Sequence, residues 1–382
     1  MMQRHSMYLY PWDLRDEGAG NVADRLRATG IDGVTLATSY HAGKFLRPHA
    51  PSGKVYFPED GTVYFTPDSA LYRELVPQRA RMADDYDALR AVATNAADLA
   101  VTAWTVGLHN TRLGQAHPHL TTQTVYGDKL VNALCPAQPE VRHYLTALCV
   151  DTATQPGVGE IALETPGWQA FRHGHHHEFE LIELPDRVQV MMGTCFCPAC
   201  RAGAAAAGVD IAGLADDTRH QLDRFFAEGT PPATNPQTDP DWQAYIAWRA
   251  GTVTGLVAEI VAAIPANVGL AIIPTTQTPN SLCWIEGSDL AALAKVADRL
   301  EVPAYQTGVA QIAEDAAWVR KRAGDDARIG YIVRPTFPHL ADSAEVVQAV
   351  SALRALGPSS ISFYNYGHMR LSALDWIATA LA

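Results

Sequence analysis

Eight short, continuously apolar segments alternate with longer alanine-rich segments along this chain. Strands covered on both faces of a parallel sheet are typically unbroken apolar runs, and each needs a crossover, usually a helix, to reach the next strand. We expect strands at residues 7–12, 33–39, 100–108, 159–164, 268–274, 299–305, 329–333 and 360–366. We expect helices at residues 21–29, 85–99, 140–154, 241–264, 289–296, 311–323, 343–356 and 372–381. Eight such units predict an α/β fold, a (β/α)8 TIM barrel.

A doubly wound open sheet is the competing topology, but it normally has fewer strands and a glycine-rich first turn. The first turn here, PWDLRDEGAGN, contains no G-x-G-x-x-G. Two connections are long, at 40–86 after the second strand and at 165–240 after the fourth. Both leave the carboxyl ends of strands, where barrel enzymes carry their active sites. We therefore expect one barrel domain over residues 1–382, with a histidine- and cysteine-rich helical excursion at about 165–240.

The balance of charge excludes one class of partner. The 382 residues have a formal net charge of −12 and show no basic stripe, so we expect no nucleic-acid partner. No apolar run reaches the roughly 18 residues of a membrane span, and no segment is typical of a signal peptide. We therefore expect no membrane association and a cytoplasmic location. The sequence leaves homo-oligomer formation open.

The segment Cys195-Phe-Cys197-Pro-Ala-Cys200 places three thiols within six residues. In a large chain without a secretory segment, such spacing indicates a metal site before disulfides. Three thiolates can occupy three corners of a tetrahedral Zn²⁺ site, and we choose Cys135 as the fourth ligand. An all-thiolate site has no open position, so the zinc is expected to be structural. The alternative is that these are ordinary buried cysteines.

Three features together resemble the family 42 β-galactosidases and related uncharacterised glycoside-hydrolase-like barrels. They are a Cys135-Pro segment before a helix, a strand ending in Glu164, and the C-x-C-x2-C motif followed by Arg201. The resemblance covers roughly residues 100–210. It implies that the four cysteines bind zinc beside the barrel and that Glu164 is the general acid/base. The seventh strand, IGYIVRP, lacks the carboxylate expected of the family's nucleophile.

Glu164 also attracts attention without that resemblance, because it ends the apolar strand GEIALE. A carboxyl group held near apolar Trp168 can have a raised pKa and act as a general acid. The alternative is that Glu164 forms a structural salt bridge at the strand end. The following loop is crowded with groups that can bind metal, act as a base or hold sugar hydroxyls. They are His173, His175, His176, His177 and Glu178, of which we expect His176 and Glu178 to point inward.

Aromatic and polar side chains follow all eight expected strands. Such side chains suit stacking on sugar rings and hydrogen bonding to hydroxyl groups, while Lys44, Arg47 and Arg334 can hold a substrate carboxylate or phosphate. The substrate-binding candidates are Trp12, Asp13, Tyr40, His41, Lys44, Arg47, Trp104, His109, Asn110, His176, Tyr305, Gln306, Arg334, Tyr364 and Asn365.

Ordinary glycoside hydrolysis needs a second carboxylate. We rank Glu286 first and Glu178 second, followed by Asp13 and Asp128. Glu286 lies just before an expected helix start. Its alternative role is to stabilise the positive end of that helix dipole with its negative charge.

These observations favour a carbohydrate-active enzyme that takes a small carbohydrate or glycoside, specifically a glycoside hydrolase with Glu164 as general acid/base. A metal-dependent sugar isomerase, epimerase or lyase, with metal held by the histidine-rich loop, is the second hypothesis. The third is a barrel that binds carbohydrate without catalysis, motivated by the absent seventh-strand carboxylate.

Overall fold

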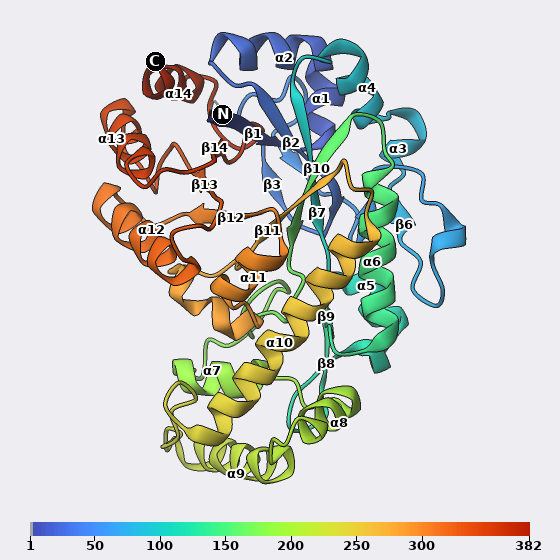
Figure 1. Cartoon of the computed structure of the whole chain (residues 1–382), viewed down its shortest axis with the longest axis vertical. Helices are drawn as coiled ribbons and strands as arrows, with labels where there is room; N and C mark the ends of the chain where they lie inside the picture. Colours follow the sequence, from blue (N-terminus) through green and yellow to red (C-terminus); the bar gives the residue numbers. More distant parts are fainter. Residues whose placement is uncertain (1–2) are drawn as a thin grey trace.

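Eight parallel strands close into a barrel in the computed structural model, which describes residues 3–382 (Figure 1). Each strand pairs with its neighbour in chain order, and the first strand pairs with both the second and the last. The strands are β1 (Arg4–Leu9), β2 (Gly33–Tyr40), β7 (Ala100–Val106), β10 (Val158–Glu164), β11 (Gly269–Ile273), β12 (Arg299–Ala304), β13 (Ile329–Val333) and β14 (Ser360–Phe363). The expected (β/α)8 barrel is confirmed.

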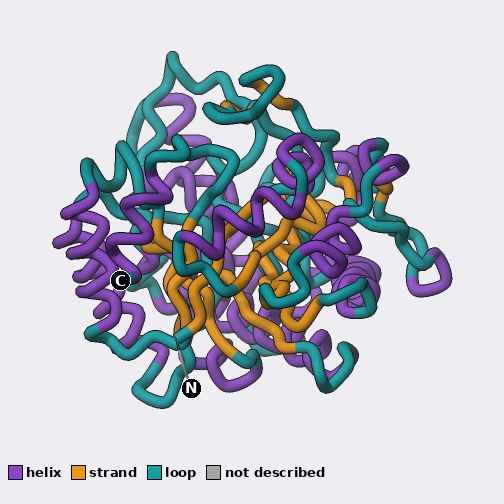
Figure 2. The backbone as a smooth tube through the Cα atoms, turned by 90° about the horizontal axis from the view of Figure 1, so that it is seen from above, coloured by secondary structure: helices purple, strands orange, loops and turns teal. Residues whose placement is uncertain are grey.

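Helices surround this barrel, as the view from above shows (Figure 2). The surrounding helices are α1 (Pro11–Glu17), α2 (Ala19–Ala28), α4 (Ala88–Asn95), α6 (Pro139–Ala153), α10 (Pro240–Ala263), α11 (Leu290–Val296), α12 (Val309–Ala323), α13 (Ser343–Arg354) and α14 (Ala373–Leu381). The largest hydrophobic core consists of buried aliphatic side chains from the strands and these helices. A second, aromatic cluster includes Tyr8, Tyr10 and Trp104.

The first strand ends earlier than expected, and the reason is local. Pro11 begins α1, because its fixed φ suits the first helical position. Tyr10 is the N-cap, and its backbone N–H donates to the Asp13 carboxylate over 3.0 Å. Trp12 and Asp13 therefore lie in the first turn of a helix rather than at a strand end.

Three excursions extend from the carboxyl ends of strands. The first holds β3 (Phe45–Leu46), β4 (Val55–Tyr56), β5 (Thr62–Val63), β6 (Gln78–Arg79) and α3 (Met82–Asp85). The second, unexpected, follows β7 and holds α5 (Thr111–Ala116), β8 (Thr121–Gln123) and β9 (Lys129–Leu134). The third holds α7 (Asp186–Gly193), α8 (Pro198–Ala206) and α9 (Ile211–Glu228), which gather around one end of α10 (Figure 1).

Helix α10 differs from the expectation that no segment is apolar enough to cross a membrane. By length and composition alone, α10 is long and apolar enough to cross a membrane. Core helices of soluble proteins pass the same test. Here Leu256, Val257 and Ile260 are fully buried in the main core, and Trp242 and Tyr245 are buried against α7–α9. Helix α10 therefore connects the barrel to the third excursion.

Candidate active site and cysteine cluster

A cavity of about 210 Å³ lies at the carboxyl ends of the barrel strands. Sites at this face are the rule for TIM-barrel enzymes. Seven of the sequence-predicted residues line it, namely Tyr40, His41, Trp104, Glu164, Tyr305, Arg334 and Tyr364. The other lining residues are Tyr8, His173, Ile273, Thr275, Thr276, Thr278, Pro303 and Ile332.

Glu164 is the last residue of β10, and its side chain reaches the cavity. The indole Nε1 of Trp104, on neighbouring β7, donates a 2.7 Å hydrogen bond to its Oε2. Burial raises the pKa of Glu164 to about 7, although the Trp104 hydrogen bond and the charge of Arg334 oppose that shift. The adjacent indole is thus Trp104 and not Trp168, which packs beside the cysteines. A carboxyl group of this pKa can both donate and accept a proton near neutral pH.

Tyrosine hydroxyls form a network beside Glu164. The Tyr10 hydroxyl lies 3.1 Å from the hydroxyls of both Tyr40 and Tyr364. Burial raises the pKa values of all three tyrosines, so they are protonated near neutral pH. Tyr8 packs edge-on against Trp104, with ring centroids 5.2 Å apart. The network presents both hydroxyl groups and aromatic faces to the cavity.

Arg334 follows β13 and brings a permanent positive charge into the cavity. Its guanidinium carbon lies 3.8 Å from the Tyr305 ring centroid and 5.2 Å from that of Tyr364. One guanidinium nitrogen is 3.3 Å from Nε2 of His339. Arg334 forms no ion pair with any carboxylate of residues 3–382. The seventh strand thus ends in a cation where the family resemblance would place a nucleophile.

Three histidine rings lie together at one side of the cavity: His41 stacks on His109, and His173 meets His109 edge-on. The ring of His41 lies 4.1 Å from that of His109, which is 5.2 Å from the ring of His173. Burial lowers the pKa of each, that of His173 to about 4, so all three are neutral near pH 7. The expected inward orientation of His176 and Glu178 is wrong, because their side chains are 84% and 82% exposed. His173 is the histidine of this loop that reaches the cavity.

The second carboxylate candidates lie outside the cavity. Glu286 is buried behind Thr276, whose backbone N–H and hydroxyl donate to it over 3.2 and 2.9 Å. Burial raises the pKa of Glu286 to about 7, although hydrogen bonds from Thr276 and its neighbours oppose that shift. Asp128 accepts a 2.9 Å hydrogen bond from Thr124 in the turn between β8 and β9. Glu164 is therefore the only carboxylate that lines the cavity among the described residues.

Several other candidates hold the fold together beside the cavity. Arg47 is buried, 2.7 Å from Asp16 and 3.5 Å from Asp13. Asn110 is the N-cap of α5 and accepts a hydrogen bond from the backbone of Leu113. Because these groups bind one another or the backbone, they are not available to a substrate.

The remaining candidates also lie outside the cavity lining. Trp12 stacks on Tyr10 at 4.3 Å, and Lys44 is exposed. Gln306 donates to buried Asp315, and Asn365 accepts from the backbone of Gly367. The sequence prediction of the cavity lining did not include Tyr8, although a signal for it exists. Inward-facing residues alternate along a barrel strand, and Tyr8 precedes Tyr10 by two positions. The lining threonines, by contrast, belong to a loop without such periodicity.

The four predicted cysteines come together beside the barrel. All are completely buried, and their sulfur atoms lie within 4.8 Å of one another. The Cys135 sulfur is 3.4 Å from that of Cys200, 3.7 Å from that of Cys197 and 3.8 Å from that of Cys195. None of these cysteines is in a disulfide. The cluster has the donor atoms and spacing to bind one metal ion.

A buried arginine lies next to the cysteine cluster. The Arg249 guanidinium stacks 4.5 Å from the Trp168 ring and donates a 2.8 Å hydrogen bond to the carbonyl of Ile285. It forms no ion pair with a carboxylate in the described part of the chain. Burial lowers the pKa of Arg249, and the neighbouring tyrosine and cysteines oppose that effect. An anionic set of thiolates would balance this otherwise isolated charge.

No family model matches this chain, and no curated protein matches its sequence. The glycoside hydrolase domain of PgaB (BpsB) from Bordetella bronchiseptica is similar in structure, with a TM-score of 0.60 and 13% identity over 100% of this chain and 99% of that one. A β-galactosidase from the psychrophilic Marinomonas ef1 has a TM-score of 0.58 and 12% identity, over 99% of this chain but 59% of its own. The catalytic domain of β-amylase from Paenibacillus polymyxa has a TM-score of 0.54 and 12% identity, over 99% of this chain and 98% of that one.

At these identities the likeness concerns the fold alone. The resemblance to glycoside-hydrolase-like barrels that the sequence indicated is confirmed at that level, whereas membership of family 42 is not established. This chain is a (β/α)8 barrel of the architecture that these glycoside hydrolases share.

Proposed function

We propose that this protein is a glycoside hydrolase in which Glu164 is the general acid/base. The observation that carries the proposal is one carboxyl group, with its pKa raised to about 7, facing a cavity of about 210 Å³ at the catalytic face of a barrel. Trp104, Tyr305 and Tyr364 supply aromatic faces for a sugar ring. The glycoside hydrolases of the same architecture support the same chemistry by analogy.

In the proposed reaction, protonated Glu164 donates its proton to the glycosidic oxygen while the bond from that oxygen to the anomeric carbon breaks. The Glu164 carboxylate then accepts a proton from the water that completes hydrolysis. The Trp104 indole holds the carboxyl group in place through its hydrogen bond. We assign Glu286 a positioning role, because it contacts Thr276 rather than the cavity. The group that stabilises the anomeric carbon is therefore not a second carboxylate of the cavity wall.

We also propose that Cys135, Cys195, Cys197 and Cys200 hold a structural Zn²⁺ ion. Zinc–sulfur bonds of about 2.3 Å in a tetrahedron place sulfur atoms about 3.8 Å apart. The sulfur–sulfur distances of 3.4, 3.7 and 3.8 Å from Cys135 fit that arrangement. Four thiolates leave no open position for a substrate, so this zinc would stabilise the fold and take no part in the reaction.

The second hypothesis, a metal-dependent isomerase, epimerase or lyase, has less support. Among residues 3–382, the cysteine cluster is the only group of histidine, cysteine or acidic side chains with metal-ligand spacing. His41 and His109 stack face to face, which is an aromatic contact rather than a shared metal site. The third hypothesis is a barrel that binds carbohydrate without catalysis. Measured turnover of any glycoside would exclude it and favour our proposal.

Glu164→Gln tests the proposal because it keeps the size of the side chain and removes the titrating proton. We expect hydrolysis of a panel of alkyl glycosides and disaccharides to fall by about 10²–10⁴-fold, while substrate binding is retained. The loss should be smaller for aryl glycosides, whose leaving groups need little protonation. Glu178→Gln makes the same chemical change at an exposed site and should leave activity unchanged. A fully active Glu164→Gln enzyme would exclude Glu164 as the acid/base. A wild-type protein that binds glycosides without cleaving any would instead support the non-catalytic hypothesis.

A further inference from the structure

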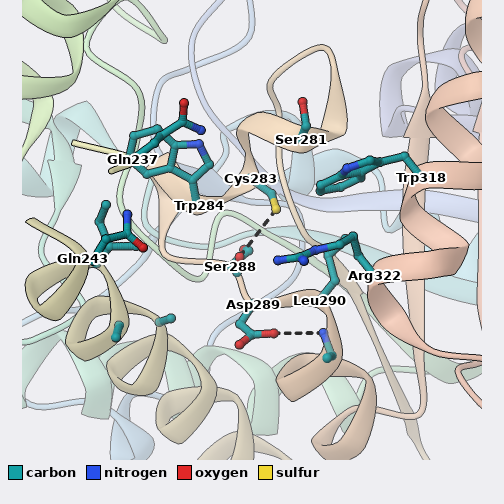
Figure 3. Close-up of a pocket in the computed structure, with 14 residues that line it drawn as sticks. Gln237, Gln243, Ser281, Cys283, Trp284, Ser288, Asp289, Leu290, Trp318 and Arg322 are labelled. Carbon is teal, nitrogen blue, oxygen red and sulfur yellow. Dashed lines mark hydrogen bonds between the residues drawn. The ribbon is translucent and has the colours of Figure 1, made fainter. Parts of the chain in front are cut away.

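A series of hollows leads sideways from the Glu164 cavity to the outside of the barrel. Thr278 lines both the cavity and a neighbouring hollow of about 560 Å³. Ser281 and Trp318 line that hollow and also a pocket of about 710 Å³, which Trp284 borders (Figure 3). We call this path, marked by Thr278, Ser281, Trp318 and Trp284, the lateral groove. The shared lining residues place the three hollows next to one another, beginning at the candidate active site.

The lateral groove lies where the outer ring places a short helix between two long ones. Helix α11 has 7 residues, whereas its neighbours α10 and α12 have 24 and 15. The 3₁₀ helix η3 (Asn280–Glu286) connects β11 to this region and supplies both Ser281 and Trp284. A seven-residue helix spans only about 10 Å. It therefore leaves a space between the two longer helices at one of its ends.

The walls of the outer pocket combine aromatic and polar groups. Trp284 and Trp318 are partly exposed and stand on opposite sides of the pocket, with Cys283 and Ser288 between them (Figure 3). The Arg322 guanidinium carbon lies 5.9 Å from the Trp318 ring centroid. The exposed polar side chains around the pocket are Gln237, Gln243, Asp289 and Arg322.

This composition matches the chemistry of a glycan. A sugar ring has an apolar face that packs on an indole, and a rim of hydroxyl groups that bonds to amides, carboxylates and guanidinium groups. A groove for a lipid or an apolar helix would instead be lined mainly by aliphatic side chains.

We propose that the lateral groove binds an extended glycan, whose one end occupies the Glu164 cavity and whose further sugar units pass Trp318 and reach Trp284. The substrate is then a polysaccharide or long oligosaccharide rather than a small glycoside. Cleavage in the cavity rests on the proposed function, but glycan binding in the groove is measurable without it.

Calorimetric titration of the Glu164→Gln protein tests this inference without turnover. The probes are chitohexaose, cellohexaose and maltohexaose, each compared with its own disaccharide. We expect at least one hexasaccharide to bind at least about fivefold more tightly than its disaccharide, since each of two stacked indoles contributes roughly two- to tenfold in affinity. Adding Trp318→Leu should abolish most of that advantage and leave disaccharide affinity unchanged, whereas Trp318→Phe should retain most of it.

Phe226→Leu is the matched control, because it removes an exposed aromatic ring of α9 outside the groove. Thermal unfolding of each variant establishes that it is folded. The inference is overturned if no hexasaccharide binds more tightly than its disaccharide, or if the advantage survives both Trp318→Leu and Trp284→Leu. If Trp318→Leu changes the oligomeric state and no glycan binds, the groove is an interface between copies of this chain. That result would also overturn the inference. Normal hydrolysis by Glu164→Gln alone would reject the proposed function and leave the groove intact.

Discussion

At the scale of single residues, the cavity is defined by one titrating acid and one fixed cation. Burial raises the pKa of Glu164 to about 7, while the charge of Arg334 opposes that shift. When Glu164 is protonated, as a general acid must be, Arg334 is the only permanent charge among the lining residues. A substrate with an anionic substituent would balance that charge.

The pH profile follows from these two residues. The active form of a general acid is the protonated one, so kcat/KM should fall as pH rises through about 7. Arg334→Gln removes the cation that lowers the pKa of Glu164, so this decline should move to higher pH. The measurement is kcat/KM for an alkyl glycoside, whose leaving group needs protonation, over a pH range that extends roughly two units on either side of that pKa. Arg90→Gln, at an exposed arginine of α4 away from the cavity and the lateral groove, is the control. An unmoved decline in Arg334→Gln would contradict the assignment.

The cysteine cluster joins elements that lie far apart along the chain. Cys135 lies between β9 and α6, Cys195 and Cys197 lie between α7 and α8, and Cys200 is in the first turn of α8. The Cys197 sulfur accepts a hydrogen bond from the backbone of Cys200, so Cys197 is also the N-cap of α8. A metal bound here would attach the third excursion to the barrel.

Cys197→Ser removes a metal ligand and keeps the helix cap, because serine is itself a favoured N-cap. Its effect therefore reports the metal alone. We expect the variant to lose its zinc and its melting temperature to fall by on the order of 10 °C, since structural zinc contributes several kcal/mol to folding. Elemental analysis and thermal unfolding measure the two effects. Cys283→Ala, at a buried thiol outside the cluster, should keep one zinc per chain. Native protein without zinc would contradict the proposal.

At the scale of the whole molecule, the two ends of the barrel interior have opposite chemistry. Aromatic rings and Glu164 occupy the carboxyl end, whereas buried Arg299 lies near the amino end. Arg299 on β12 pairs with Glu160 on β10 over 2.7 Å and with Glu301, and it donates a 2.7 Å hydrogen bond to Ser360 on β14. These side chains come from alternate strands, as layers inside TIM barrels do. The ionic layer connects three strands that are not neighbours.

Arg299→Met should destabilise the barrel by about 3–5 kcal/mol at pH 7, because it leaves buried carboxylates without their partner. Burial raises the pKa of Glu160, but Arg299 outweighs this effect and holds the pKa below its ordinary value. The stabilisation from this pair is therefore present above the ordinary glutamate pKa and is lost as pH falls through the lowered one. Urea unfolding should accordingly show a smaller loss in Arg299→Met at acidic pH.

Arg4→Met is the control for that experiment, because Arg4 is half-exposed and lies 3.9 Å from the same Glu160. Its pairing should contribute no more than about 1 kcal/mol. Equal effects of the two substitutions would show that the ionic layer does not stabilise the barrel.

Features that depend on local pattern are predictable from the residues alone. Apolar runs alternating with helical segments predicted the barrel, because a strand covered on both faces needs apolar residues at every position. The position of Glu164 at the end of such a run predicted that its side chain would reach the carboxyl face. The spacing of Cys195, Cys197 and Cys200 predicted a shared site, because neighbours along the chain are neighbours in space.

The fold of the long connections depends on tertiary contacts, because their residues meet partners that are distant in the sequence. It placed His173 rather than His176 in the cavity, and it placed Glu286 behind Thr276. It paired Arg47 with acidic residues of α1 and removed it from the list of substrate ligands. The lateral groove likewise depends on the packing of a short helix between two long ones. No periodicity encodes such contacts, since each depends on the shape of the closed barrel.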